Sequence, residues 1–186
     1  MKIILIGYRA TGKTTVGHLL ADKIGIPFVD TDRLIEEAAG MTVGDVIQSE
    51  GWEKFRDRET QAVLSLREMG VCIVATGGGA IVRSVNTDTL KKEGILIYLK
   101  ARSADIVGRL RLDEQRERTR PRFTSAGLEA ETIAVLNERI PLYETLADYT
   151  ADTSDKSPPR VADEIYEHLL ETGVVAEINS LKKVNR

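Results

Sequence analysis

The stretch Gly7-Tyr-Arg-Ala-Thr-Gly-Lys-Thr-Thr15 reads G-x-x-x-x-G-K-[ST] and directly follows the apolar run Lys2-Ile-Ile-Leu-Ile6. Apolar residues continue after it at helical spacing, at Val16, Leu19, Leu20 and Ile24. The pattern therefore predicts a buried strand, a glycine-rich loop and an amphipathic helix in succession. This is the setting in which the motif binds polyphosphates.

The residue types in this loop suit a nucleoside triphosphate. Glycines allow consecutive backbone N–H groups to turn toward the phosphates, and the start of a helix adds partial positive charge. The Lys13 ammonium would reach the β- and γ-phosphates, and the Thr14 hydroxyl would be a ligand of Mg²⁺. The remaining residues expected to bind ATP from this loop are Ala10, Thr11, Gly12 and Thr15.

The composition is that of one globular domain. The chain has 186 residues, of which 42% are hydrophobic and 30% charged, and its net charge is −3. This charge disfavours a nucleic-acid binder, although arginines cluster between Arg102 and Arg122. No apolar stretch approaches the length of a membrane span and none resembles a leader, so we expect a cytoplasmic protein without membrane contact.

Short apolar runs alternate with helical patterns along the chain. Runs of strand length occupy residues 2–6, 27–30, 71–76, 95–99 and 148–152. The longer runs lack polar alternation, which is typical of strands covered by helices on both faces, so we expect an α/β fold with a mostly parallel sheet. We expect a single domain over residues 1–173 and a flexible tail over 174–186.

Ligands of such sheets gather outside the carboxyl ends of the strands. Besides the phosphate loop, two strand ends carry suitable sequence, Asp30-Thr31-Asp32 and Gly77-Gly-Gly79. One aspartate could simply cap the next helix, whereas two carboxylates beside a nucleotide could orient a metal-bound water and act as general base. Three successive glycines indicate that a ligand approaches the backbone closely. The three strand ends therefore predict one shared site.

Further motifs make the chain resemble the shikimate kinases over roughly residues 2–170. These motifs are Phe55-Arg56 with Glu59, Arg120-Pro121 and Arg139-Ile-Pro-Leu-Tyr143. The resemblance implies a three-layer P-loop kinase fold, with a five-stranded parallel sheet flanked by helices and a mobile lid at about 112–127. It also implies transfer of the ATP γ-phosphate to the 3-hydroxyl of shikimate with Mg²⁺ as cofactor. We expect ATP and shikimate to be the binding partners of a monomer.

The resemblance assigns roles to the residues around the reacting phosphate. Asp32 would hydrogen-bond the shikimate hydroxyls and act as base, and Asp30 would lie near Mg²⁺ through a water. Arg120 would close over the phosphates with the lid, so the expected catalytic residues are Asp32, Lys13 and Arg120. Either Arg109 or Arg111 would stack on adenine, and the residues assigned to ATP beyond the loop are Arg111, Arg120 and Lys156.

The acceptor side follows from the same resemblance. Arg56 and Arg139 would hold the acceptor carboxylate, a role that suits the planar fork of a guanidinium. Glu59 would hold the substrate or an arginine in place. Backbone N–H groups of the glycine turn would also bind the substrate, and they belong to Gly77, Gly78 and Gly79. Trp52 is expected to support its helix rather than to contact the substrate.

Three alternatives remain at the level of sequence. A kinase of another small polyol acid, such as gluconate, could use the same fold and the same two arginines. A nucleotide-binding regulator without catalysis would keep the phosphate loop, but the complete set of expected site residues disfavours it. A nucleic-acid role is the least favoured, since no aromatic residues are interleaved with the arginine cluster.

Overall fold

The computed structural model describes residues 1–116 and 127–184, the side chains at 113–116 and 184 excepted. Within these ranges, five strands form one parallel sheet in the order β2-β3-β1-β4-β5. The strands are β1 Lys2–Ile6, β2 Phe28–Asp30, β3 Ile73–Ala75, β4 Gly94–Lys100 and β5 Tyr149–Asp152. The α/β fold with a mostly parallel sheet predicted from the apolar runs is confirmed, and so is the five-stranded parallel sheet implied by the family resemblance.

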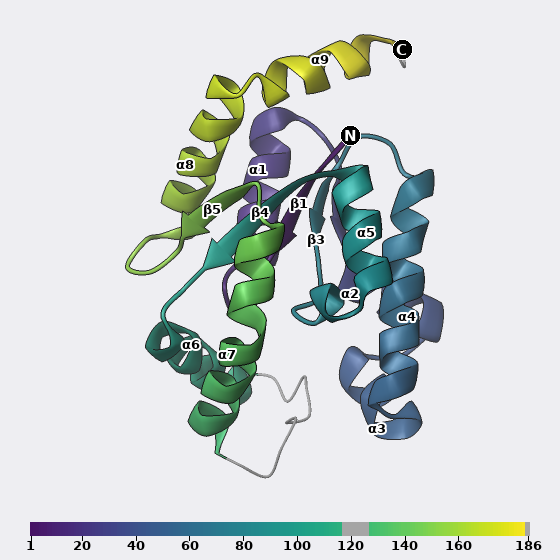
Figure 1. The fold of residues 1–186 in the computed structure, drawn as a ribbon, viewed down its shortest axis with the longest axis vertical. Coiled ribbons are helices and arrows are strands. Elements are labelled where there is room, and N and C mark those ends of the chain that lie inside the picture. The colour runs from purple at the N-terminus through teal and green to yellow at the C-terminus, as the bar shows by residue number, and fades with distance from the viewer. Residues whose placement is uncertain (117–126, 185–186) are drawn as a thin grey trace.

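Helices flank this sheet on both faces (Figure 1). In the described part of the chain they are α1 Lys13–Ile24, α2 Thr31–Ala39, α3 Val43–Glu50, α4 Trp52–Ser65, α5 Ser84–Glu93, α6 Ser103–Arg116, α7 Leu128–Leu146, α8 Pro158–Glu171 and α9 Val174–Val184. Two short 3₁₀ helices occupy Leu66–Glu68 and Ala80–Val82. None of the described helices has the length and apolar character needed to cross a membrane.

The central position of β1 explains why its residues after Lys2 are all apolar. All of its residues are buried. Ile3 and Leu5 pack in the core cluster that contains residues of α1 and α8, whereas Ile4 and Ile6 pack in the cluster that contains residues of α4, α5 and α7. Because helices cover both faces of the strand, side chains on both faces must be apolar.

The order of the strands brings the expected site segments to one edge. β1 lies between β3 and β4, with Ile3 opposite Ile73 on one side and Ile95 on the other. β2 pairs with the far side of β3. Because all of these pairs are parallel, the carboxyl ends of β1, β2 and β3 lie at the same edge. The phosphate loop, Asp30 and the glycine turn follow those three ends directly.

The carboxy-terminal segment differs from the flexible tail that we expected from the sequence. It forms helix α9, which begins at Val174 after Gly173, a residue with φ of 79°. Val174, Val175 and Ile178 are buried in the same cluster as α1 and α8. Lys182 Nζ donates to the carbonyl of Ile24 at 2.8 Å, where α1 ends. The apolar stripe of this short segment thus packs on the core and orders it as a helix.

Candidate active site

The phosphate loop has the backbone that its glycines predict. Gly7 and Gly12 have φ of 144° and 93°, a region that other residues rarely adopt. A Cβ on Gly7 would lie 2.7 Å from the carbonyl oxygen of Leu99, so no side chain fits there. Gly12 is the N-cap of α1 and carries no side chain that could cover the first N–H groups of the helix. Those groups can therefore bind an anion.

Lys13 folds back over this loop. Its Nζ donates to the carbonyl oxygens of Gly7 at 2.8 Å and Tyr8 at 2.7 Å, and the Thr11 hydroxyl donates to the same Tyr8 oxygen at 2.8 Å. The Lys13 side chain is buried among the loop atoms. The ammonium group held in this way can also bind a phosphate oxygen, with which it would form a charge-assisted hydrogen bond.

Thr14, Asp30 and Asp32 meet where β2 ends. The Thr14 hydroxyl donates to Asp30 Oδ2 at 2.9 Å, and Asp30 Oδ1 accepts the backbone N–H of Asp32 at 3.0 Å. Asp30 is therefore the N-cap of α2, the structural role considered for one of the two aspartates. The same carboxylate also places oxygen atoms beside the Thr14 hydroxyl, and oxygen atoms are the ligands that Mg²⁺ prefers.

This pair of oxygen donors fits a magnesium ion that takes its other ligands elsewhere. Among the described residues, no group of three or more His, Cys, Asp or Glu side chains could hold a metal. Mg²⁺ in nucleotide sites characteristically uses one or two protein ligands and completes its shell with phosphate oxygens and water. The residues present therefore fit Mg²⁺ delivered with a nucleotide.

A cavity of about 610 Å³ opens in front of the phosphate loop. This volume lies within the range typical of small-molecule sites. The residues that line it are Arg9, Ala10, Thr11, Gly12, Lys13, Thr14, Thr15, Val16, Asp30, Asp32, Thr76, Gly78, Arg109, Thr153, Lys156, Pro158 and Val161. All the expected phosphate-loop residues are thus on one cavity with both aspartates and Lys156.

Arg109, and not Arg111, belongs to the described lining of this cavity. Arg109 donates to the carbonyl oxygens of Ala10 at 3.2 Å and Thr153 at 3.0 Å, and so bridges two loops of the cavity. Arg111 is 61% exposed and forms an ion pair with Glu129 at 3.3 Å. Two residues along an α-helix correspond to a rotation of about 200°, which turns Arg111 away from the face that carries Arg109. Arg109 therefore lies on the cavity and Arg111 does not, whereas the contact of either residue with ATP stays a prediction.

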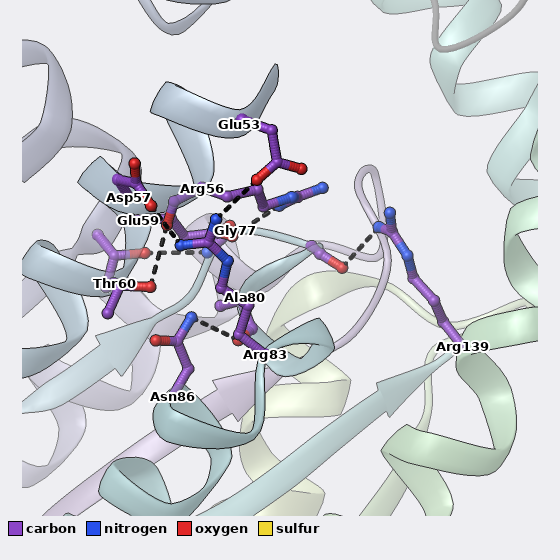
Figure 2. Close-up of polar contacts among 12 residues, drawn as sticks. Glu53, Arg56, Asp57, Glu59, Thr60, Gly77, Ala80, Arg83, Asn86 and Arg139 are labelled. Carbon is purple, nitrogen blue, oxygen red and sulfur yellow. Dashed lines mark hydrogen bonds and ion pairs between the residues drawn. The ribbon is translucent and has the colours of Figure 1, made fainter. Parts of the chain in front are cut away.

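A second, narrow pocket adjoins the first and contains most of the acceptor residues expected from the sequence, whereas Asp32 lines the first cavity and Gly77 lines neither. Its lining consists of Tyr8, Arg9, Ile47, Trp52, Phe55, Arg56, Glu59, Gly78, Gly79 and Arg139. Arg56 comes from α4 and Arg139 from α7, and the two approach the glycine turn from opposite sides (Figure 2). In this conformation the pocket holds only about 20 Å³, so an organic acid would require the surrounding side chains to move apart.

Glu59 fixes the direction of Arg56. Arg56 Nη1 lies 2.6 Å from Glu59 Oε2, and the Glu59 side chain is 1% exposed. Burial raises the pKa of the Glu59 carboxyl above its usual value, and the nearby Arg56 guanidinium offsets part of this rise. Figure 2 shows the pair beside Gly77. A Cβ on Gly77 would lie 2.7 Å from Glu59 Oε1 and 2.8 Å from Asp32 Oδ1, so only glycine lets both carboxyl groups approach here.

The three glycines of the turn make different contacts. Gly77 donates its N–H to the Thr31 hydroxyl at 2.9 Å, so this group, which we expected to bind the substrate, has a partner within the protein in this structure. The carbonyl oxygen of Gly78 accepts from Arg139 Nη1 at 2.9 Å and from the Tyr143 hydroxyl at 2.6 Å. Gly79 borders the Arg56 guanidinium, which would overlap a Cβ at that position.

Tyr143 and Arg139 stand one turn apart on α7 and meet at the same carbonyl oxygen. Tyr143 is fully buried and stacks on Tyr98, with ring centroids 4.9 Å apart. Burial raises the pKa of the Tyr143 hydroxyl, which therefore remains a hydrogen-bond donor. The hydroxyl thus helps to fix the turn against which Arg139 is held.

Comparison with known proteins agrees with this arrangement. The family model described as shikimate kinase matches residues 9–170. A shikimate kinase from Syntrophus aciditrophicus is 42% identical over 171 residues, which cover 88% of each chain. The chain belongs to the shikimate kinase family. The solved structure of shikimate kinase from Acinetobacter baumannii in complex with shikimate superimposes with a TM-score of 0.85 at 34% identity, over 92% of this chain and 93% of the other.

A gluconokinase from Sinorhizobium meliloti is a more distant structural neighbour. Its TM-score is 0.58 at 14% identity, over 96% of this chain and 97% of the other. At that identity the likeness concerns the fold alone. The P-loop kinase fold expected from the sequence is therefore confirmed, and membership of the shikimate kinase family distinguishes this chain from its gluconate-kinase neighbour.

The structure brings together nearly all of the residues that the sequence predicted for the site. Arg120 and most of the expected lid at about 112–127 lie outside the described residues. Sequence reasoning gave no individual role to Arg9, Thr153 or Tyr143, and it assigned Trp52 only a supporting role. Trp52 lines the acceptor pocket and also lies beneath Arg56, whose Cζ is 5.6 Å from its ring. A charged residue between the two loop glycines was the one signal that could have revealed Arg9.

Proposed function

We propose that this member of the shikimate kinase family transfers the γ-phosphate of ATP to the 3-hydroxyl of shikimate, with ADP and shikimate 3-phosphate as products. The observation that carries the proposal is the position of the pocket between Arg56 and Arg139, directly beside the nucleotide cavity. The guanidinium groups of partly buried Arg56 and buried Arg139 suit a carboxylate, and the adjoining cavity has the loop for a triphosphate. The two halves of a kinase site therefore meet.

Asp32 is proposed as the general base because it borders both halves of the site. It lines the nucleotide cavity, and its Oδ1 would lie 2.8 Å from a Cβ at Gly77 in the turn beside the acceptor pocket. The hydroxyl oxygen of the acceptor would form a bond to the γ-phosphorus while the bond from that phosphorus to the ADP oxygen breaks. The hydroxyl proton would pass to the Asp32 carboxylate.

The other residues would bind and stabilise charge. Lys13 and the loop N–H groups would hold the phosphates, and Thr14, with Asp30 through a water, would hold Mg²⁺. The bound ion would neutralise negative charge on the β- and γ-phosphates. Arg120, which lies outside the described residues, retains the lid role that the family resemblance implies. We further propose a cytoplasmic monomer that binds neither nucleic acid nor membranes.

Initial rates with a panel of acids test the substrate. The purified chain is given saturating ATP and Mg²⁺ together with shikimate, quinate or gluconate, and ADP release is followed in a coupled assay. We expect shikimate to support the highest kcat/KM. Faster turnover with gluconate would favour the alternative kinase, and ATP binding without turnover on any acid would favour a regulator. Chelation of Mg²⁺ with EDTA should abolish turnover, and added excess Mg²⁺ should restore it.

Replacement of the proposed base tests the mechanism. Asp32→Asn keeps the shape of the side chain but removes the proton acceptor, so kcat should fall by about 100-fold or more. The dissociation constant of ATP, measured by calorimetry, should stay close to that of the parent. Unchanged turnover in this variant would refute the assignment of Asp32 as base.

A further inference from the structure

Arg9 and Gly78 are the two described residues that line both the nucleotide cavity and the acceptor pocket. Gly78 has no side chain, so within the described part of the chain Arg9 alone contributes a side chain to both spaces. The two residues are in contact, because a Cβ on Gly78 would lie 3.1 Å from the backbone nitrogen of Arg9. A phosphoryl group that leaves one space for the other therefore crosses the boundary that they form.

The Arg9 side chain is held inside the molecule. It is 15% exposed, and its Nη2 lies 3.1 Å from Oε1 of Glu131, whose side chain is 0% exposed. Arg9 Cζ also lies 5.7 Å from the ring centre of buried Tyr8. A fully buried carboxylate requires a cationic partner, so the pair fixes the guanidinium in one orientation. Glu131 lies in the first turn of α7, the helix that also carries Arg139.

The chemistry of phosphoryl transfer suits a guanidinium at this boundary. The phosphoryl group in transit spreads negative charge over its three equatorial oxygens, and enzymes stabilise it mainly with positioned positive charge. A guanidinium has five N–H donors in a planar fork and binds phosphate oxygens bidentately. It can contact a phosphoryl group on one edge while a carboxylate holds another.

We propose that Arg9 is a catalytic residue that stabilises the phosphoryl group during transfer, and that Glu131 is a positioning residue that orients Arg9. This inference rests on the proposed kinase function. In the step concerned, the acceptor oxygen bonds to the γ-phosphorus, the bond to the ADP oxygen breaks and the hydroxyl proton passes to Asp32. Arg9 keeps all of its protons throughout and acts only through its charge and hydrogen bonds.

Steady-state kinetics of Arg9 variants test the proposal on whichever acid of the panel the parent phosphorylates. Arg9→Met removes the charge but keeps an unbranched side chain, and kcat should fall by at least about tenfold. The KM for ATP should change less than kcat, because the lost contact belongs to the transition state. Arg9→Lys should recover part of kcat, since the charge returns without the planar fork. Arg67→Met is the matched control, because Arg67 precedes β3 and bonds to Thr89 at the opposite edge of the sheet.

Glu131 variants separate positioning from general stability. Glu131→Gln should lower kcat in the parent background but have no further effect on kcat when Arg9 is already Met, because Glu131 acts through Arg9. The double variant Arg9→Met/Glu131→Gln also removes both buried charges, so it provides the kinetic measurement if Arg9→Met alone fails to fold. Circular dichroism and urea unfolding establish which variants are folded.

The outcomes distinguish this inference from the proposed function. A parent that turns over, together with a folded Arg9→Met or double variant whose kcat is within about twofold of the parent, overturns the role of Arg9 alone. Equal effects of Glu131→Gln in both backgrounds overturn the positioning role. A parent that phosphorylates no acid of the panel refutes the proposed function, and the role of Arg9 with it.

Discussion

At Gly79 the backbone passes so close to the Arg56 guanidinium that a methyl group on this residue would displace the guanidinium. The φ of Gly79 is −108°, a value open to any residue, so Gly79→Ala tests the close approach without backbone strain. We expect the KM for shikimate to rise by about tenfold or more, because one of the two proposed carboxylate-binding arginines is displaced. The KM for ATP should change little. Initial rates at varied concentrations of each substrate measure both constants.

Gly70→Ala is the control for this substitution. No heavy atom lies within 4 Å of a Cβ built at Gly70, so the methyl group finds open space. Its kinetic constants should match those of the parent. A normal KM for shikimate in Gly79→Ala would contradict the placement of Arg56 on the acceptor.

Glu59 links the acceptor pocket to the stability of the fold. Its pKa is raised in the folded protein, chiefly because the carboxyl is buried. An acid whose pKa rises on folding favours the folded state most below its unfolded pKa of about 4.3, and this advantage is lost as pH rises through the folded value. The free energy of unfolding of the parent should therefore fall relative to that of Glu59→Gln as pH increases from about 4.

Urea unfolding over a pH series measures this difference. Glu53→Gln removes a carboxyl that is 92% exposed from the same helix and is the matched control. A difference between the parent and Glu59→Gln that stays constant over the series would contradict a raised pKa.

Individual site residues could be predicted from the sequence where a short contiguous stretch of residues identifies them. Lys13 and Thr14 belong to one contiguous motif, and Asp32 follows a recognisable strand. Arg9 escaped prediction because its partner, Glu131, is 122 positions away in the sequence. The contact depends on where α7 lies in the fold, and no local pattern records that.

Among the elements, α9 provides the clearest test of packing. Ile178 is fully buried in the cluster that joins α9 to α1 and α8. Ile178→Ala should lower the free energy of unfolding by about 2–5 kcal/mol, because it removes buried methyl groups and leaves a cavity. kcat should be unaffected, since α9 contacts the end of α1 opposite the phosphate loop. Urea unfolding and steady-state rates measure the two quantities.

The control for this prediction is Leu170→Ala on α8, where the side chain is 48% exposed. Its effect on stability should be much smaller. If both substitutions cost the same, α9 does not pack as described.

The same elements show why some features could not be read from the sequence. Strands β1, β3 and β4 were recognisable because each is a short, mostly apolar run. Helix α9 was not, because its apolar stripe is brief and the segment is otherwise polar and basic. The orientation of α6 could not be read from the sequence either. Orientation decides between Arg109 and Arg111, and it depends on the packing of α6 against α7.

For the whole molecule, nucleotide binding should add to the stability of the fold. The phosphate loop joins β1 to α1, and both belong to the main core cluster. A ligand that binds only the folded state raises the free energy of unfolding by about 2.7 kcal/mol at 100 times its dissociation constant. ADP with Mg²⁺ at that concentration should therefore raise the apparent Tm, which differential scanning fluorimetry measures. Lys13→Ala should lose most of this shift, and an equal shift in that variant would contradict the proposed phosphate site.

The position of β1 in the sheet also bears on the order in which the protein can form during synthesis. β1 leaves the ribosome before its two neighbours in the sheet, because the partners of Ile3 are Ile73 on β3 and Ile95 on β4. Ordered contacts over such separations form only after the intervening chain has been made. A nascent chain that ends before β4 therefore lacks one of the two strands that pair with β1, from which the phosphate loop starts. The ability to bind ATP should therefore be acquired only after β4 has been translated, although the phosphate-loop motif precedes both β3 and β4 in the chain.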